Sequence, residues 1–257
     1  MKILIATHKE YDMPKISGYH PIMVGASLQN NIPNDYLRDD SGENISELNP
    51  FFNELTALYW AKYNLCDEDI IGLDHYRRYL GKKSGHKLQN ILNKQQIYDA
   101  LDEVDILLPK QRNYFIETQK VHYLNAHNHE PYIEMEKVIR EKFPKYLPAF
   151  EIMEQNKKAH LFNMSIMKQA DFQSYTNFIF GVLDEVAKSI PFETYVGQEK
   201  RVFGFLSERL MDTWLYTEKK TFREFPIVAT EKTNWLDKGI QFLKRKFLRN
   251  SNKKVHF

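Results

Sequence analysis

The sequence predicts an α/β domain with a mixed, mainly parallel sheet flanked by helices, and a C-terminal half richer in helix. Short apolar runs alternate with stretches of helical periodicity over the first 110 residues, as is typical of α/β sheets. Beyond that point the apolar spacing is mainly helical. With 257 residues, of which 42% are hydrophobic, the chain can bury one sizeable core but is short for two full-sized domains. We therefore expect one domain over residues 1–230 and a basic extension over residues 231–257.

The first predicted strand is the Ile-rich run at residues 2–6, which ends in the polar residues Thr7, His8 and Lys9. The apolar segment at residues 21–26 predicts a second strand. In open α/β sheets, ligands bind at the carboxyl ends of the strands. The polar residues after the first strand are therefore expected at a ligand site.

A polar stretch at residues 29–49 predicts a loop, followed by a helix. Asn49 is suited to cap this helix and Pro50 to its first position, and apolar residues recur at helical spacing up to about Asn64. The other predicted elements are, in order, strands at 69–74 and 104–109 with a helix at 94–103 between them, a helix with Tyr132, Met135 and Ile139 on one face, a helix after Lys145, a strand at 160–167, helices at 169–189 and 199–218, and a strand at 225–229.

The overall charge and the single cysteine limit the possible classes of protein. A formal charge of +2 gives no strong case for nucleic acid as the main partner. One cysteine, Cys66, cannot form an internal disulfide and fits a reducing compartment. The apolar run at the N-terminus is too short for a signal peptide, and no stretch approaches the roughly 20 apolar residues of a membrane span. We expect a cytoplasmic protein, soluble or peripheral on the inner face of the cell membrane.

The strongest chemical signal is the segment Asp74-His75-Tyr76-Arg77-Arg78, directly after a predicted buried strand. Two guanidiniums and an imidazole at such a place are costly to desolvate unless they face an anion, and guanidinium forks match the geometry of phosphate. A diphosphate is the natural ligand of such a cluster. The alternative is that both arginines are ordinary surface residues or pair with acids of the preceding loop.

Several stretches of the chain resemble the polysaccharide-biosynthesis glycosyltransferases catalogued as domain of unknown function 4422, which occur in capsule and exopolysaccharide gene clusters. The matching stretches are KILIATHK (2–9), YHPIMVGA (19–26), DDSGENIS (39–46), NPFFNELTALYWAKYN (49–64), IIGLDHYRRYL (70–80), DILLPK (105–110), HLFNMSIM (160–167) and RVFGFLSERL (201–210). They run in order over most of the chain, so the resemblance is far more specific than a single short motif.

The resemblance implies a single nucleotide-binding domain of the GT-A kind. It also implies transfer of a sugar, often galactose or galactofuranose, from a UDP-sugar donor to a lipid-linked oligosaccharide, in capsular, exopolysaccharide or O-antigen biosynthesis. In GT-A enzymes the carboxyl end of the first strand meets the nucleotide, which here implicates Thr7, His8 and Lys9.

The metal motif of GT-A enzymes is altered in this sequence. Such enzymes usually carry an Asp-x-Asp motif that holds a divalent cation against the diphosphate, but Asp74 is followed by His75, Tyr76, Arg77 and Arg78. Cationic side chains can stabilise a leaving diphosphate as a metal ion does. We therefore expect no required cofactor, with Mn²⁺ or Mg²⁺ as the alternative. Asp74 is expected to provide one metal ligand or to bind the ribose or sugar of the donor.

Glu208 is the candidate general base, and it is grouped with His75 as a catalytic residue. Glu208 interrupts an apolar helical stretch and lies in one of the matching segments, and an inverting transfer needs a base near the acceptor hydroxyl. The alternative is a structural ion pair within the helix or with Arg209.

Further binding residues are expected in three places. Asp40 and Asn44 lie in a loop that is able to close over the donor, although they are also ordinary turn formers. His127, Asn163 and Arg209 are candidates for binding the acceptor sugar. A metal site in the histidine cluster around His127 is not favoured, because no Cys or second acidic motif completes it.

The C-terminal extension predicts a basic amphipathic helix. Its apolar residues Leu236, Ile240, Leu243 and Phe247 fall at helical spacing beside Trp235. Its eight basic residues, against the single acid Asp237, are Lys232, Lys238, Lys244, Arg245, Lys246, Arg249, Lys253 and Lys254. This composition suits an anionic membrane surface, where a lipid-linked acceptor lies. The alternative is a helix packed on the domain with a solvated basic face.

Two other functions fit parts of the pattern. A non-catalytic module for a phosphate ligand or nucleic acid would use the arginines and the basic extension, but the near-neutral overall charge counts against it. A hydrolase of nucleotide-sugars would use the same pocket with water as the acceptor. The main expectation is a glycosyltransferase that binds no nucleic acid.

Overall fold

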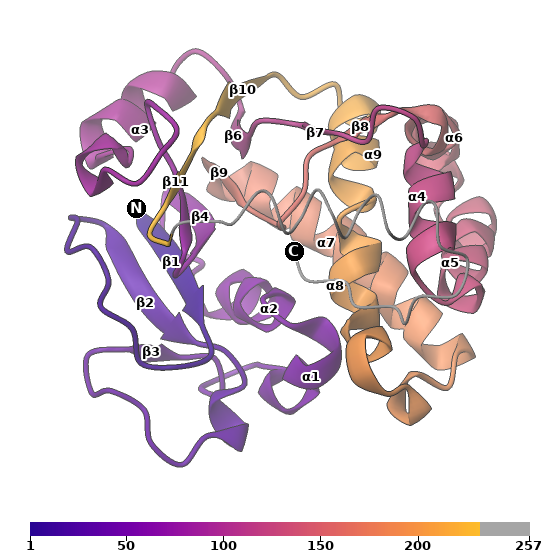
Figure 1. The fold of residues 1–257 in the computed structure, drawn as a ribbon, viewed down its shortest axis with the longest axis horizontal. Coiled ribbons are helices and arrows are strands. Elements are labelled where there is room, and N and C mark those ends of the chain that lie inside the picture. Colours follow the sequence, from indigo (N-terminus) through magenta and orange to yellow (C-terminus); the bar gives the residue numbers. More distant parts are fainter. Residues whose placement is uncertain (232–257) are drawn as a thin grey trace.

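A mixed sheet runs through residues 1–231, the part of the chain that the computed structural model describes (Figure 1). Its strands lie in the order β10-β6-β9-β4-β1-β2-β3. These strands are β1 (Lys2–Thr7), β2 (Tyr19–Met23), β3 (Leu37–Arg38), β4 (Ile70–His75), β6 (Ile106–Pro109), β9 (Ser165–Lys168) and β10 (Phe222–Phe225). In this strand order, β9 is antiparallel to both of its neighbours and the other adjacent strands are parallel. The predicted mixed, mainly parallel sheet is therefore confirmed.

Two further strands extend the sheet, and two others form a small separate ribbon. β5 (Arg78–Leu80) folds back antiparallel on β4, and β11 (Ile227–Ala229) pairs with β5. The separate ribbon consists of β7 (Arg112–Asn113) and β8 (Lys158–Ala159). The β4–β5 hairpin is important for the site because it turns the chain back within two residues of the end of a central strand.

Helices cover both faces of the sheet, and most of them follow residue 110, as predicted. They are α1 (Asn49–Phe52), α2 (Leu55–Asn64), α3 (Lys94–Leu101), α4 (Gln119–Ala126), α5 (His129–Lys142), α6 (Leu147–Gln155), α7 (Gln169–Ser189), the 3-10 turn η6 (Gly197–Arg201), α8 (Val202–Ser207) and α9 (Leu210–Thr217). None of the helices within residues 1–231 is long and apolar enough to cross a bilayer.

The alternation of side chains along β1 explains how the two cores form. Leu4 and Ala6 face a large core shared with α2, α5, α7, α8 and α9. Ile3 and Ile5 face a second core on the other side, which includes α3. Figure 1 shows α3 apart from the group of helices α4 to α9. Because central parallel strands are buried on both faces, they appear in the sequence as continuous apolar runs.

The helix predicted over residues 49–64 is broken in two. Asn53 adopts φ 51° and ψ −129°, which an α-helix cannot accommodate, so α1 ends there and α2 begins two residues later. The Asn49 side chain stabilises the break, because its amide donates to the carbonyl oxygen of Asn53 over 2.7 Å. The break leaves Glu54 at the start of α2.

Two more predicted elements are interrupted in a similar way. The strand predicted over residues 160–167 begins only at β9, because Phe162 and Asn163 have φ angles of 76° and 53°. The helix predicted over residues 199–218 consists of η6, α8 and α9, with Glu208 at the junction between α8 and α9. The basic amphipathic helix predicted near the C-terminus lies outside the described residues, apart from residue 231.

Candidate active site

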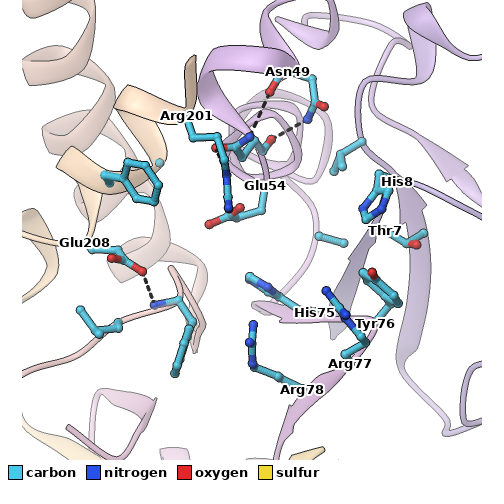
Figure 2. A pocket seen from close by; sticks show the side chains of 17 residues that line it. Thr7, His8, Asn49, Glu54, His75, Tyr76, Arg77, Arg78, Arg201 and Glu208 are labelled. Atoms are coloured by element: carbon cyan, nitrogen blue, oxygen red, sulfur yellow. Dashed lines mark hydrogen bonds between the residues drawn. The ribbon is translucent and has the colours of Figure 1, made fainter. Parts of the chain in front are cut away.

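A pocket of about 340 Å³ lies at the carboxyl ends of β1, β2 and β4 (Figure 2). Its lining comes from these strand ends, from the breaks described above and from η6 and α8: Ala6, Thr7, His8, Val24, Asn49, Asn53, Glu54, His75, Tyr76, Arg77, Arg78, Leu161, Phe162, Arg201, Gly204, Phe205 and Glu208. The structure therefore brings together six predicted site residues that are far apart in sequence: Thr7, His8, His75, Arg77, Arg78 and Glu208. This is the edge of the sheet at which α/β folds bind ligands.

The β4–β5 hairpin supplies the cationic side of the pocket. His75 pairs with Arg78 across the hairpin, so Tyr76 and Arg77 form the turn between them. The Arg78 guanidinium lies 4.8 Å from the ring centroid of Phe162. Burial, together with the charge of Arg77, lowers the pKa of Arg78. A guanidinium in such surroundings favours an anionic ligand, because the negative charge of the ligand would offset the cost of burying the guanidinium beside Arg77.

Arg201, for which the sequence predicted no role, adds a third guanidinium from the opposite wall. It ends η6, and its Nε donates to Oδ1 of Asn53 over 3.2 Å. Figure 2 shows Arg201 reaching into the pocket towards Glu54, across from His75 and Arg78. The one feature of the sequence that could have pointed to Arg201 is its place as the first residue of the segment RVFGFLSERL (201–210), which resembles the family.

The two histidines of the pocket are not a source of positive charge. Burial lowers the pKa of His75, and burial together with the charge of Lys9 lowers the pKa of His8. Both imidazoles are therefore mainly neutral at neutral pH. The expectation that His75 helps to balance the charge of a diphosphate is corrected accordingly: the guanidiniums provide the charge, and His75 offers a neutral hydrogen-bonding ring.

Two carboxylates face the guanidiniums. Oε1 of Glu54 accepts a hydrogen bond from the Asn163 side chain at 2.7 Å, and Oε1 of Glu208 accepts one from the backbone N–H of Phe162 at 2.9 Å. Burial raises the pKa of Glu208, and the charge of Arg209 offsets part of this rise. A carboxyl group with a raised pKa is suited to accept and release a proton near neutral pH.

Asn163 supports the pocket from behind its lining. It is 6% exposed, and its side chain donates to Glu54 and to the Gly204 carbonyl while accepting from the Ser207 hydroxyl. These bonds join α2 to α8 across the positive-φ turn at Phe162 and Asn163. In this structure Asn163 therefore orients Glu54, whereas it was predicted to contact the acceptor.

Asp74 lies on the other face of the sheet from the pocket. Successive residues of a strand point to opposite faces, so His75 faces the pocket and Asp74 faces Tyr19 and Tyr79. Asp74 is 0% exposed, and neither of its carboxyl oxygens has a hydrogen bond of good geometry with a described residue. Burial raises its pKa to about 8. The predicted role of Asp74 as a metal ligand or donor contact does not fit this orientation.

The residues around the pocket do not match the metal site of a GT-A enzyme. The position of the first acid of an Asp-x-Asp motif is taken by Asp74, which faces away, and the position of the second by Tyr76. Within residues 1–231, no three His, Cys, Asp or Glu side chains are grouped to hold a metal ion. The two carboxylates of the pocket each already accept a hydrogen bond and stand among three guanidiniums.

We predict that Asp74→Asn stabilises the fold at alkaline pH and keeps the activity. Between the ordinary pKa of 3.8 and the folded value of about 8, the folded chain holds a proton that the unfolded chain has released, so stability falls as pH rises. Because a tenfold change in proton affinity is worth about 1.4 kcal/mol, this cost is at most on the order of 6 kcal/mol. Thermal unfolding should show the Tm advantage of the variant growing from pH 5 to pH 8 and levelling off above. A pH-independent difference in Tm would contradict this assignment.

Three other predicted residues lie outside the pocket lining. Asp40 forms two hydrogen bonds, of 2.9 and 2.6 Å, with the guanidinium of Arg38. The Asn44 side chain bonds within its own loop, to Gly42 and Ser46. Lys9 lies with Nζ 5.5 Å from the ring centroid of Tyr76, beside the pocket. Asp40 and Asn44 thus bond within their own loop, which is also joined to α2 by hydrogen bonds from Trp60 and Asn64.

The two remaining acceptor candidates are buried behind the lining. The ring of His127 stacks on Phe205 with a centroid distance of 4.1 Å, and only Phe205 reaches the pocket. Arg209 is 2% exposed, with its guanidinium about 6 Å from the ring centroids of Tyr114 and Tyr123. In this structure neither side chain is placed to contact an acceptor directly.

Comparison with known proteins agrees with this architecture. No curated protein matches the chain in sequence. A solved structure of WbbM, a bifunctional glycosyltransferase in its apo form, has a TM-score of 0.82 and 26% sequence identity, covering 90% of this chain and 45% of that chain. This chain thus spans less than half the length of WbbM. The family described as "Domain of unknown function (DUF4422)" matches residues 2–220. The chain belongs to the DUF4422 family.

Proposed function

We propose that this chain is a glycosyltransferase that transfers a sugar from a UDP-sugar donor to an acceptor hydroxyl. One observation carries the proposal: three guanidiniums and two carboxylates converge on a pocket at the ligand-binding edge of the sheet. The guanidiniums suit a diphosphate, and a carboxylate suits the proton of an acceptor. The structural likeness to a bifunctional glycosyltransferase supports the same activity.

The proposed reaction breaks the bond between the anomeric carbon and the diphosphate, and forms a bond from that carbon to the acceptor oxygen. The electron pair of the broken bond leaves with UDP, whose negative charge grows in the transition state. Arg78 and Arg201 lie on opposite walls and are placed to stabilise that charge. In an inverting transfer, Glu208 takes the proton of the acceptor hydroxyl.

We propose that the enzyme requires no metal ion. This follows from the orientation of Asp74 away from the pocket and from the guanidiniums that line it. The donor sugar of galactose or galactofuranose type, the lipid-linked oligosaccharide acceptor and a role in capsular, exopolysaccharide or O-antigen biosynthesis rest on the family resemblance. A cytoplasmic location, with the basic C-terminal extension on the inner face of the membrane, belongs to the same proposal.

We predict that Glu208→Gln lowers kcat by about 100-fold and leaves donor binding unchanged, since general-base catalysis typically contributes about that factor or more. The amide can still accept the Phe162 N–H, so the local structure should persist. In the wild type, the rate should rise with pH through the raised pKa of Glu208, because the base acts in its ionised form. Single-turnover kinetics with a titration of UDP separates the two effects. Near-normal turnover would exclude Glu208 as the base.

The experiment that tests the function is a screen of UDP-sugars with synthetic lipid-linked acceptors, read by mass spectrometry. A product that is heavier by one sugar unit supports transfer, whereas free sugar alone indicates a hydrolase. Thermal stabilisation by UDP but not by DNA would exclude the nucleic-acid module, because a ligand that binds only the folded state raises Tm. Activity that is lost with a chelator and returns with Mn²⁺ would overturn the metal-independent proposal.

A further inference from the structure

An exposed apolar tip follows the small ribbon of β7 and β8. Phe115 and Ile116 are 73% and 62% exposed, and Val121, one turn into α4, is 44% exposed. Within residues 1–231, Phe115 is matched in exposure among large apolar side chains only by Val196, at 75%. Single exposed apolar residues are common on proteins, but three within seven positions form a local patch.

The backbone holds the tip in a strained but well-defined shape. Phe115 has φ 59°, an unfavourable conformation for a bulky L-residue that costs about 1–2 kcal/mol. The turn is stabilised by the Asn113 side chain, which accepts the Phe115 N–H at 2.8 Å, and by a bond from the Ile116 N–H to the Tyr114 carbonyl at 2.7 Å. A strained residue with an exposed aromatic ring points to a role outside the fold.

Exposed basic residues occur in both strands of the ribbon that carries the tip and next to them in the chain. Lys110, Arg112, Lys157 and Lys158 are all exposed. The ribbon itself brings these segments together, because Asn113 pairs with Lys158 and the Tyr114 N–H donates to the Lys157 carbonyl at 2.8 Å.

The acid within the same segment is turned to another partner. Glu117 accepts hydrogen bonds from the side chains of His122 and Asn125, on α4. Glu117 keeps its charge, because burial lowers the pKa of His122 to about 4 and leaves that ring neutral at neutral pH. The patch therefore combines exposed apolar side chains with a cationic border, in which four basic residues outnumber this acid.

The tip is directly connected to the wall of the pocket. Tyr114 packs in a small cluster with Ala159 and Leu161, and Phe162 packs against that cluster. Leu161 and Phe162 line the pocket. A surface that docks at the tip would thus lie within a few residues of the proposed transfer site.

We propose that the apolar tip docks on an anionic lipid bilayer. Aromatic and aliphatic side chains gain free energy by entering the interface of a bilayer, and each Lys or Arg near an anionic surface adds attraction. The tip combines exposed apolar side chains with exposed basic residues. An acidic protein partner would bind the basic residues but would not require the exposed ring of Phe115. The tip residues are not part of the C-terminal extension, and vesicle binding requires no donor and no turnover.

The test is co-sedimentation of the full chain with vesicles of equimolar phosphatidylglycerol and phosphatidylcholine. Phe115→Asn/Ile116→Thr should bind these vesicles about ten-fold more weakly, since partial burial of two large apolar side chains accounts for at least that factor. Asn tolerates a positive φ, so the fold should persist. The matched control is Ile133→Thr/Ile152→Thr, which removes two apolar side chains that are each 59% exposed elsewhere. This control should bind as the wild type does.

A charge variant tests the cationic border. Lys157→Glu/Lys158→Glu should weaken binding to the anionic vesicles and reduce its dependence on salt. Equal vesicle binding by the wild type and the tip variant would overturn the proposal, and so would a wild type that does not bind these vesicles. A change in oligomeric state without a change in vesicle binding would assign the tip to contact with a second copy. Thermal stabilisation by UDP, measured on the same samples, reports separately on the proposed function.

Discussion

Replacing Arg78 by alanine should lower kcat/KM for sugar transfer by roughly 100- to 1,000-fold, the usual cost of removing one preorganised group that stabilises charge in a transition state. The guanidinium lies in a pocket where burial already lowers its pKa. It is therefore held at a cost to the folded state that a bound diphosphate would relieve. The activity should fall while Tm stays the same or rises.

Two comparisons make this result specific to Arg78. Arg77 is its neighbour in the hairpin, but the Arg77 side chain is 42% exposed and its guanidinium lies 3.1 Å from the Glu231 carboxylate. Arg77→Ala should therefore cost less, about ten-fold or below, as expected for a partly solvated charge. Arg78→Lys should recover only part of the rate, because lysine keeps the charge but loses the bidentate geometry. Equal losses for Arg77→Ala and Arg78→Ala would show that the pocket has no preferred phosphate contact.

The central strands and the ligand-binding edge were predictable because their signals are local. Buried parallel strands produce continuous apolar runs, and the polar residues that follow them share one edge of the sheet. Thr7, which follows from this rule, and His75, which follows from the cluster after the next buried strand, both line the pocket. Arg77 and Arg78 could be singled out from the sequence because two adjacent guanidiniums after a buried strand suit an anion, whereas the alternative of an ordinary surface ion pair describes the contact of Arg77 with Glu231.

The rest of the pocket depends on contacts that connect distant parts of the chain. Asn53, Phe162 and Asn163 adopt positive φ angles, and each interrupts a periodic pattern that otherwise predicts a regular element. These conformations are stabilised from afar: Asn163 bonds Glu54, 109 residues away in sequence, and Arg201 bonds Asn53, 148 residues away. Periodicity reports the face that an element buries, but it does not report a break that only the assembled fold stabilises.

The misplacement of Asp74 has a different cause. Strand alternation required Asp74 and His75 to face opposite sides of the sheet, and this was readable from the sequence. The sequence did not reveal which of the two faces carries the pocket. The resemblance to metal-dependent GT-A enzymes favoured the aspartate, whereas the structure directs His75 to the pocket.

The loop that contains Asp40 shows how a structural carboxylate can resemble a functional one. Asp39, its neighbour, is 0% exposed and accepts four hydrogen bonds. The donors are the backbone N–H groups of Gly25 and Ala26, at 2.8 and 2.9 Å, and the hydroxyls of Ser46 and Thr56, at 2.5 and 2.6 Å. Asp39 therefore joins the end of β2 to α2 behind the pocket.

Asp39→Asn should destabilise the fold by about 3 kcal/mol or more, because an amide nitrogen replaces one acceptor oxygen and faces buried donors that then lack a partner. For a domain of this size, such a loss corresponds to a decrease in Tm on the order of 10 °C. Activity should fall as well. Thr56 links Asp39 to the side chain of Asn49, which lines the pocket and stabilises the break at Asn53.

Asp40→Asn is the matched control, because it makes the same chemical change one position along the chain. The Asp40 carboxylate is partly exposed and accepts its side-chain hydrogen bonds from Arg38, two residues away, so its loss should cost at most about 1 kcal/mol. Denaturant unfolding of the two variants measures the difference directly. If both variants lost the same stability, the four bonds of Asp39 would not be what holds the loop. A different outcome is that Asp40→Asn keeps its stability but loses affinity for the donor. That result would show that the loop closes over the donor and that Asp40 contacts the ligand after breaking its bonds to Arg38.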